Sequence, residues 1–120
     1  MYLQEFLEDK EGISYPMVGY LNGKSYPTGS LRRFGYSVLS GGQIFGEDVG
    51  EIKTHEFHYF DSEECGDSFH AKKPLSTREW NCMISTKTLL AGYPHIAYRG
   101  NVEVARSFLR AVARNRVLSE

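Results

Sequence analysis

The sequence has little of several features that would define a protein class at once. Its two cysteines, Cys65 and Cys82, are too few for a disulfide framework and favour a reducing compartment. Its formal net charge of -1 gives no reason to expect nucleic acid or an anionic membrane as a partner. No apolar run approaches the ~20 residues that span a bilayer, and the acidic residues 1–10 are unlike a signal peptide. We therefore expect a cytoplasmic protein with neither nucleic acid nor a membrane as partner.

The length of 120 residues fits one small domain, 1–120, and its composition of 41% hydrophobic and 24% charged residues is ordinary for a soluble protein. At the N-terminus, residues 1–8 place Leu3, Phe6 and Leu7 on one stripe and predict a short amphipathic helix. No capping residue precedes it, which favours a chain cut inside a larger fold.

The middle of the chain shows β-type patterns. Residues 61–80 between these patterns are polar and are predicted to be irregular. The Gly41-Gly42 pair predicts a hairpin between the strands that flank it, and a second turn is expected at residues 86–87. Short apolar or alternating stretches predict the strands themselves: 15–21, 34–39, 43–45, 51–60, 81–85 and 88–93.

A second helix is predicted after Asn101, which is a good N-cap residue. Glu103 lies in the first turn, where the helix dipole favours an acidic side chain. The arginines of this region recur at helical spacing and indicate a solvated face rather than a nucleic-acid site. The helix should bury a stripe of apolar side chains: Val104, Phe108, Leu109 and Val112. The residues thus predict a mixed β-sheet with an N-terminal and a C-terminal helix.

The stretch from His55 to Tyr59 is rich in side chains that titrate, donate and accept. On a strand, His55 shares one face with Tyr59, and Glu56 shares the other with His58. Such a strand can offer an imidazole to a polar ligand, but the pattern alone favours a half-exposed strand that faces water. His95 ends a predicted strand, where it could act as a general base, although a histidine at a strand end is more often structural.

Two other kinds of site are poorly supported by the pattern. Histidines three residues apart point to opposite faces of a strand, and adding His70 or Cys65 gives no recognised metal-ligand spacing. A nucleophile elbow needs an apolar strand, a tight turn and a helix, whereas Cys65 follows an acidic stretch and Pro74 comes soon after. Cys82 is expected to be a small buried hydrophobe. We therefore predict neither a metal site nor a nucleophilic cysteine.

From residue 1 to about 114, the chain resembles the glutaminase domain of the cobyrinic acid a,c-diamide synthase family, a group of class I glutamine amidotransferases. The similar blocks follow one another in the family's order: Met1-Tyr-Leu-Gln-Glu-Phe-Leu-Glu8, Tyr15-Pro-Met-Val-Gly19, Leu31-Arg-Arg-Phe-Gly-Tyr36, Thr54-His-Glu-Phe-His-Tyr-Phe60 and Ala91-Gly-Tyr-Pro-His-Ile-Ala-Tyr98. The resemblance implies an α/β fold of the flavodoxin-like, three-layer kind, of which this chain would be a truncated part.

The same resemblance implies roles for particular residues. His95 corresponds to the catalytic histidine that activates a cysteine for attack on glutamine. His55, Glu56 and His58 correspond to a strand that borders the glutamine pocket. The family's Cys-Gly-Gly turn is absent, and Ala97 stands where a side chain orients the catalytic histidine in relatives. We therefore expect the chain to be inactive alone.

Partners and cofactors are likewise implied by the resemblance. Glutamine and a corrin substrate would bind to the full-length enzyme, whose separate domain uses ATP and Mg²⁺, whereas this chain would hold no cofactor. As a fragment with an unpaired strand edge, it is expected to form a homo-oligomer. The alternatives are an inactive binding or assembly module, or the glutaminase half of an enzyme that acts on another tetrapyrrole or a cell-wall precursor.

Overall fold

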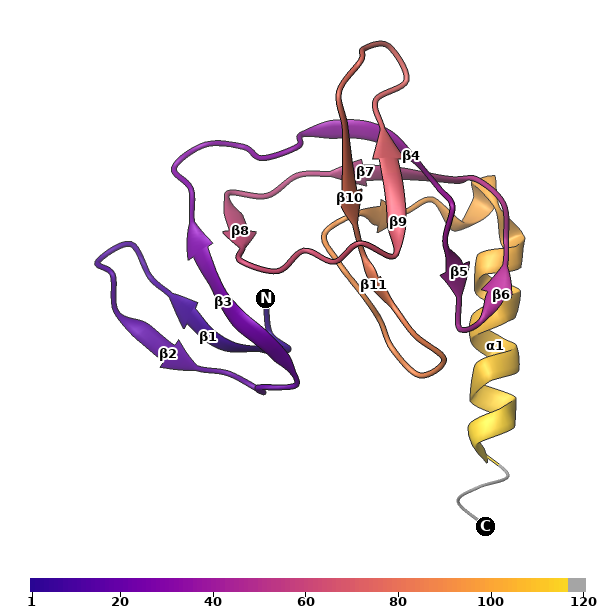
Figure 1. Cartoon of the computed structure of the whole chain (residues 1–120), viewed down its shortest axis with the longest axis horizontal. Coiled ribbons are helices and arrows are strands. Elements are labelled where there is room, and N and C mark those ends of the chain that lie inside the picture. The colour runs from indigo at the N-terminus through magenta and orange to yellow at the C-terminus, as the bar shows by residue number, and fades with distance from the viewer. Residues whose placement is uncertain (117–120) are drawn as a thin grey trace. The chain divides into compact units, whose positions relative to one another are not determined.

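The structure, a computed structural model, describes residues 1–116. It is a mixed α/β arrangement of several small sheets and one C-terminal helix (Figure 1). The chain divides into two units. Unit 1 comprises Met1–Gly35 and Glu56–Cys65, and unit 2 comprises Tyr36–His55 and the chain from Gly66 onward.

Unit 1 contains a four-stranded sheet in the order β2-β1-β3-β8. Strand β1 pairs antiparallel with β2 and parallel with β3, and β3 pairs antiparallel with β8. The strands are β1 (Gln4–Glu8), β2 (Ser14–Pro16), β3 (Leu21–Pro27) and β8 (Phe60–Ser62).

The prediction of an N-terminal helix is wrong, because residues 4–8 form strand β1. A helix of eight residues is too short to be stable without packing, and Phe6, on its apolar stripe, is 44% exposed. Pairing with strands on both sides satisfies the backbone of β1 instead. The local pattern could not show those distant partners.

Unit 2 is built on a five-stranded sheet in the order β10-β9-β4-β7-β13. Its strands are β4 (Gly35–Ser40), β7 (Ile52–Glu56), β9 (Phe69–Lys72), β10 (Glu79–Cys82) and β13 (His95–Ile96). The first residue of β4 and the last of β7 belong to unit 1. Two hairpins accompany the sheet: β5 (Gln43–Ile44) with β6 (Glu47–Asp48), and β11 (Ile84–Ser85) with β12 (Leu90–Ala91). A short 3-10 helix, η1 (Tyr98–Gly100), precedes α1 (Val102–Arg116).

Several strand predictions are tested by this arrangement. The strand predicted over 51–60 is confirmed only in part, because β7 covers Ile52–Glu56 and leaves His58 and Tyr59 outside any strand. The turn at 86–87 is confirmed between β11 and β12.

The prediction of a hairpin at Gly41-Gly42 is wrong, because the strands on either side, β4 and β5, lie in different sheets. Strand β4 lies between β9 and β7, whereas β5 pairs with β6. A Cβ on Gly42 would lie 2.3 Å from the Ser68 carbonyl oxygen, so this glycine permits a close backbone approach.

The prediction that residues 61–80 are irregular is also wrong. This stretch contains β8, β9 and the start of β10. Within β9, Phe69 and Ala71 are buried, while the intervening His70 is partly exposed. Two apolar side chains at alternate positions are enough to bury one face of a strand, and the surrounding polar residues hid this pattern.

The apolar core lies in unit 2. Its buried side chains come from the sheet, the hairpins and α1: Leu39, Ile44, Phe45, Val49, Ile52, Phe69, Ala71, Cys82, Met83, Val104 and Ala111. Unit 1 has a polar interior instead. The buried Ser25 and Ser62 hydroxyls lie 2.9 Å apart, and both donate to the side-chain oxygen of Gln4. The two units are therefore stabilised by different kinds of contact.

The C-terminal helix begins as predicted. The side-chain oxygen of Asn101 accepts a hydrogen bond from the Glu103 amide at 3.1 Å, and its side-chain nitrogen donates to the Val49 and Glu51 carbonyls. Of the expected stripe, only Val104 is buried, and the helix buries Ser107 and Ala111 with it. The other three, Phe108, Leu109 and Val112, remain at least half exposed. Within residues 1–116, no helix is long and apolar enough to cross a membrane.

Candidate functional site

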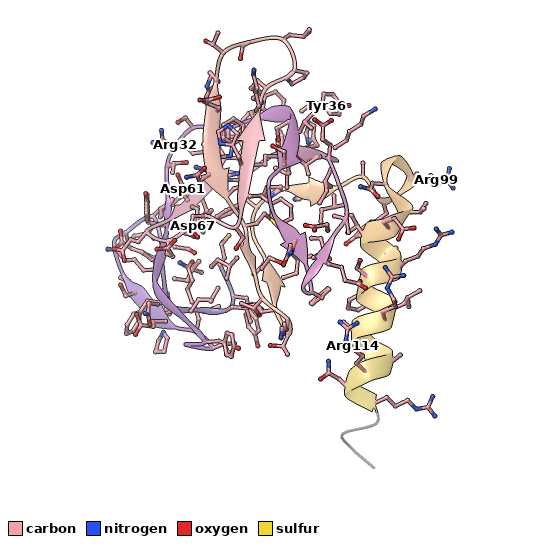
Figure 2. The ribbon with its side chains drawn as sticks, turned by 45° about the vertical axis from the view of Figure 1, so that its right-hand side comes forward. Arg32, Tyr36, Asp61, Asp67, Arg99 and Arg114 are labelled. Atoms are coloured by element: carbon pink, nitrogen blue, oxygen red, sulfur yellow. The ribbon has the colours of Figure 1, made fainter. Side chains whose placement is uncertain are left out.

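His55 and His95 lie directly opposite each other in unit 2. Strand β13 pairs antiparallel with β7, and the register places His95 against His55 and Ile96 against Thr54. The His55 ring packs edge-on against that of Tyr36, with 4.9 Å between the ring centroids. Figure 2 labels Tyr36. The structure thus brings together two of the residues to which the family resemblance gives a role, His55 and His95.

A cavity of about 390 Å³ opens beside His95. Its walls are mostly apolar, and His95 and Tyr98 supply the polar side chains. Small-molecule sites commonly combine an apolar lining with a few polar groups that orient the ligand. The exposed imidazole of His95 can therefore meet a polar ligand here. The lining residues are Met83, Leu90, Ala91, Gly92, Pro94, His95, Ile96 and Tyr98.

Glu56 and His58 lie in unit 1, together with Arg33. The Glu56 side chain is 0% exposed, and one of its carboxylate oxygens lies 3.4 Å from Arg33 Nε and 3.8 Å from His58 Nε2. His58 Nδ1 is 2.6 Å from the Phe60 carbonyl oxygen. Because that oxygen only accepts, Nδ1 carries the proton, and Nε2 is the nitrogen nearer the carboxylate. A buried carboxylate needs a counter-ion, and Arg33 supplies it.

Arg33 also binds Asp61 through two hydrogen bonds, of 2.8 and 3.1 Å. Burial raises the pKa of Asp61, but the hydrogen bonds from Arg33 and the Ser62 amide outweigh it, so this pKa lies below its usual range. For Arg33, burial lowers the pKa, but Asp61 and Glu56 outweigh this effect and hold it above its ordinary value. The guanidinium thus joins two carboxylates from β7 and β8.

Cys65 lies at the edge of this cluster and is a poor nucleophile. Its thiol donates to Asp61 at 3.3 Å. Burial, followed by the hydrogen bond to Asp61, raises the pKa of the Cys65 thiol. Since the thiolate is the reactive form, Cys65 is held in its unreactive form. The other cysteine, Cys82, is 3% exposed within the unit 2 core.

From this we predict that the purified chain releases no ammonia from glutamine above background. Neither thiol is both ionised and accessible, so no covalent intermediate should form. A coupled ammonia assay measures the rate, and Cys65→Ser should leave it unchanged. Ammonia release that disappears in Cys65→Ser would contradict the prediction and make Cys65 the nucleophile.

The predicted site residues therefore divide between the units, with His55 and His95 in unit 2 and Glu56 and His58 in unit 1. Sequence reasoning missed Arg33 and Asp61. The 31–36 block contributed to the family resemblance, but no spacing indicated that Arg33 would reach residues 56 and 61. Among residues 1–116, no three His, Cys, Asp or Glu side chains gather as a possible metal site.

The fold and these residues define a mixed α/β protein. It has a histidine pair across neighbouring strands, and a buried carboxylate follows the first of these histidines in the sequence. Comparison with known proteins is more specific: the chain belongs to the cobyrinate a,c-diamide synthase family. No family model matches the sequence.

The relatives that show this family are all cobyrinate a,c-diamide synthases. The protein from Clostridium tetani is 33% identical over 91% of this chain and 26% of its own length. The Fusobacterium nucleatum protein is 32% identical over 84% of this chain and 23% of its own length. The Streptococcus sanguinis protein is 43% identical over 53% of this chain and 15% of its own length. The chain thus spans about a quarter of the length of the first curated relatives it matches.

Proposed function

We propose that this chain forms part of the glutamine-hydrolysing half of an ATP-dependent ligase that amidates the a- and c-carboxylates of cobyrinic acid. The observation that carries the proposal is the match to cobyrinate a,c-diamide synthases over nine-tenths of the chain. The pairing of His95 with His55 beside a cavity supports it, because these are two of the residues that the family resemblance assigns to glutamine hydrolysis.

In the proposed reaction, His95 takes the proton of a cysteine thiol, and the thiolate attacks the amide carbon of glutamine. His95 then returns the proton to the departing nitrogen, the C–N bond breaks and ammonia leaves. Water then hydrolyses the thioester to glutamate. Cys65 and Cys82 do not fit the nucleophile's role, so the proposal requires a cysteine from another part of the complete protein.

Glu56 and its neighbours have a supporting role in this proposal. Arg33 fixes the buried Glu56 carboxylate, and Glu56 directly follows His55 on β7. A carboxylate held in place this way anchors the end of the strand that presents His55. ATP and Mg²⁺ would activate the acceptor carboxylate, and the proposal gives them no ligand among residues 1–116.

A chimeric enzyme tests the function. Residues 1–120 would replace the matching segment of the Clostridium tetani relative, and diamide formation would be measured with glutamine or with ammonium chloride as the nitrogen source. We expect glutamine to support the reaction. A chimera that amidates with ammonia but not with glutamine would overturn the proposal, and the unaltered relative provides the reference rate for both nitrogen sources.

An assembly role is a second candidate, and the surface of unit 1 favours it. This unit contributes none of the buried apolar core. It exposes a series of large hydrophobic side chains instead: Met1, Tyr2, Phe6, Ile13, Tyr15, Val18, Tyr20, Phe34, Phe57 and Tyr59. Adjoining exposed apolar side chains are commonly covered by a partner, and the Phe57 ring contacts both Phe34 and Tyr59. The outer strands of the unit 1 sheet, β2 and β8, each have a neighbouring strand of that sheet on one side only.

We therefore predict that the isolated chain self-associates at micromolar concentration, most simply as a twofold dimer. A charge placed on the unit 1 surface, as in Val18→Glu or Tyr20→Glu, should shift the equilibrium toward monomer. Leu75→Glu is the matched control, because Leu75 is 98% exposed in unit 2. Sedimentation velocity measures the change. A monomer at every concentration, or equal effects of all three substitutions, would contradict the prediction.

A further inference from the structure

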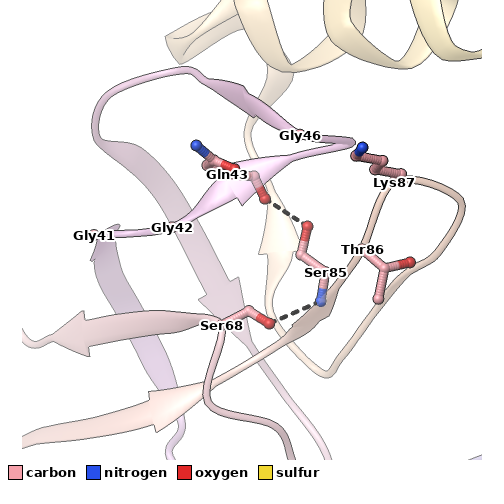
Figure 3. A pocket seen from close by; sticks show the side chains of 8 residues that line it. All are labelled: Gly41, Gly42, Gln43, Gly46, Ser68, Ser85, Thr86 and Lys87. Carbon is pink, nitrogen blue, oxygen red and sulfur yellow. Dashed lines mark hydrogen bonds between the residues drawn. The ribbon is translucent and has the colours of Figure 1, made fainter.

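A second cavity of unit 2 has a lining of a different chemical kind. It has a volume of about 420 Å³ and lies among the bend before β5, the β5–β6 turn, the β11–β12 turn and the segment before β9 (Figure 3). The residues proposed above for glutamine hydrolysis are not among those that line it. The lining consists of glycines, hydroxyl side chains, one amide and one lysine: Gly41, Gly42, Gln43, Gly46, Ser68, Ser85, Thr86 and Lys87.

Two hydroxyls of this cavity, those of Ser68 and Thr86, accept hydrogen bonds from backbone amides. Ser68 Oγ accepts the Ser85 amide at 2.9 Å. Thr86 Oγ1 accepts two amides, from Thr88 at 3.2 Å and from Leu89 at 3.0 Å. A hydroxyl has one proton to donate and two lone pairs, so both lone pairs of Thr86 are occupied.

The hydroxyl protons of Ser68 and Thr86 remain available as donors. Ser85 differs, because its hydroxyl donates to the Gln43 carbonyl (Figure 3). Across residues 1–116, no acceptor takes the proton of the Ser68 or Thr86 hydroxyl. Two hydroxyl donors beside one cavity suit a ligand that accepts hydrogen bonds.

The charge of the lining favours the same kind of ligand. Among the described residues that line it, Lys87 is the one ionisable side chain and none is a carboxylate. The nearby Asp48 carboxylate accepts the Gln43 amide at 3.4 Å. In the part of the chain that the structure describes, Lys87 makes no ion pair. Gly46 lies beside the methylene chain of Lys87, because a Cβ added to Gly46 would be 3.7 Å from Lys87 Cγ.

We infer that this cavity binds the phosphate group of a small phosphorylated metabolite. A lysine ammonium is a point charge that suits a phosphate, and hydroxyl donors complete its coordination. A planar carboxylate would instead favour the paired donors of an arginine, and none of the described lining residues is an arginine. The volume lies within the range of ligand sites and exceeds what a bare phosphate ion fills, which leaves room for the rest of the metabolite.

Titration of the full chain with inorganic phosphate tests the inference. Amide chemical shifts would be followed by NMR at constant ionic strength, with acetate as a second titrant. We expect saturable shifts at residues 41–46 and 85–88 with phosphate but not with acetate. Equal saturation by acetate would overturn the choice of phosphate, and the absence of saturation by either ion would overturn the site.

Substitutions identify the groups responsible. Lys87→Met should weaken phosphate binding about tenfold or more, whereas Lys72→Met, which removes the same charge from an exposed position of unit 2, should not. Thr86→Val should weaken binding and Thr86→Ser should restore it, because only serine keeps the hydroxyl. Wild-type affinity in Lys87→Met would overturn the inference. The result is independent of glutamine hydrolysis, which the chimera tests separately.

Discussion

Replacing His95 by asparagine in the chimeric enzyme is expected to lower the glutamine-dependent rate of diamide formation by about 10²–10⁴-fold, the usual contribution of a general acid–base group. Asparagine retains polarity and approximate size but cannot carry the proton between the thiol and the departing nitrogen. The ammonia-dependent rate should stay unchanged, because added ammonia bypasses glutamine hydrolysis. Steady-state kinetics with each nitrogen source measure the two rates.

The comparison of nitrogen sources separates a catalytic role of His95 from a structural one. His70→Asn is the control, since His70 is a partly exposed histidine of the same sheet whose side chain lies 3.3 Å from Glu79. It should leave both rates near those of the chimera. If His95→Asn lowered the ammonia-dependent rate equally, the residue would support the fold rather than the hydrolysis.

The second large effect is expected at Arg33. Arg33→Met removes the counter-ion of the buried Glu56 carboxylate and the two hydrogen bonds to Asp61. Breaking a buried charge pair commonly costs about 3–5 kcal/mol. Urea denaturation would measure the loss for the whole chain. Hydrogen exchange at the β3 and β8 amides would show whether unit 1 opens first.

Two variants test the cause of that loss. Arg32→Met removes the same charge from the exposed neighbouring residue and should have little effect. Adding Glu56→Gln to Arg33→Met should recover part of the loss, because an amide is far less costly to bury without a counter-ion than a carboxylate. A full loss in Arg32→Met, or no recovery in the double variant, would contradict the assignment of Arg33 as the counter-ion.

The sequence predicted the features that depend on neighbouring residues. The helix after Asn101 was predictable because the N-cap contact joins residues two apart. The strand around Thr54 was predictable from its alternation, and the 86–87 turn from the strands beside it. The same local reasoning failed for residues 1–8, where the partners of β1 lie as far along the chain as Ser25.

The candidate site shows the same limit. Resemblance to a family placed His55 and His95 in one site, and the strand register brings these residues opposite each other. Arg33 contacts Glu56 and Asp61, which lie 23 and 28 positions further along the chain. A periodic pattern in the sequence cannot predict contacts over such separations. Arg33 also has a positive φ of 46°, a conformation that a residue other than glycine adopts rarely and that the sequence does not mark.

The polar interior of unit 1 also affects how the protein responds to temperature. The heat capacity of unfolding rises with the apolar area exposed and falls with the polar area. Unfolding of unit 1 releases the buried Gln4, Ser25, Ser62 and Glu56 rather than an apolar core, so its heat-capacity increment is small for its size. Most of the curvature of stability with temperature therefore originates in unit 2, and cooling weakens that unit more than unit 1.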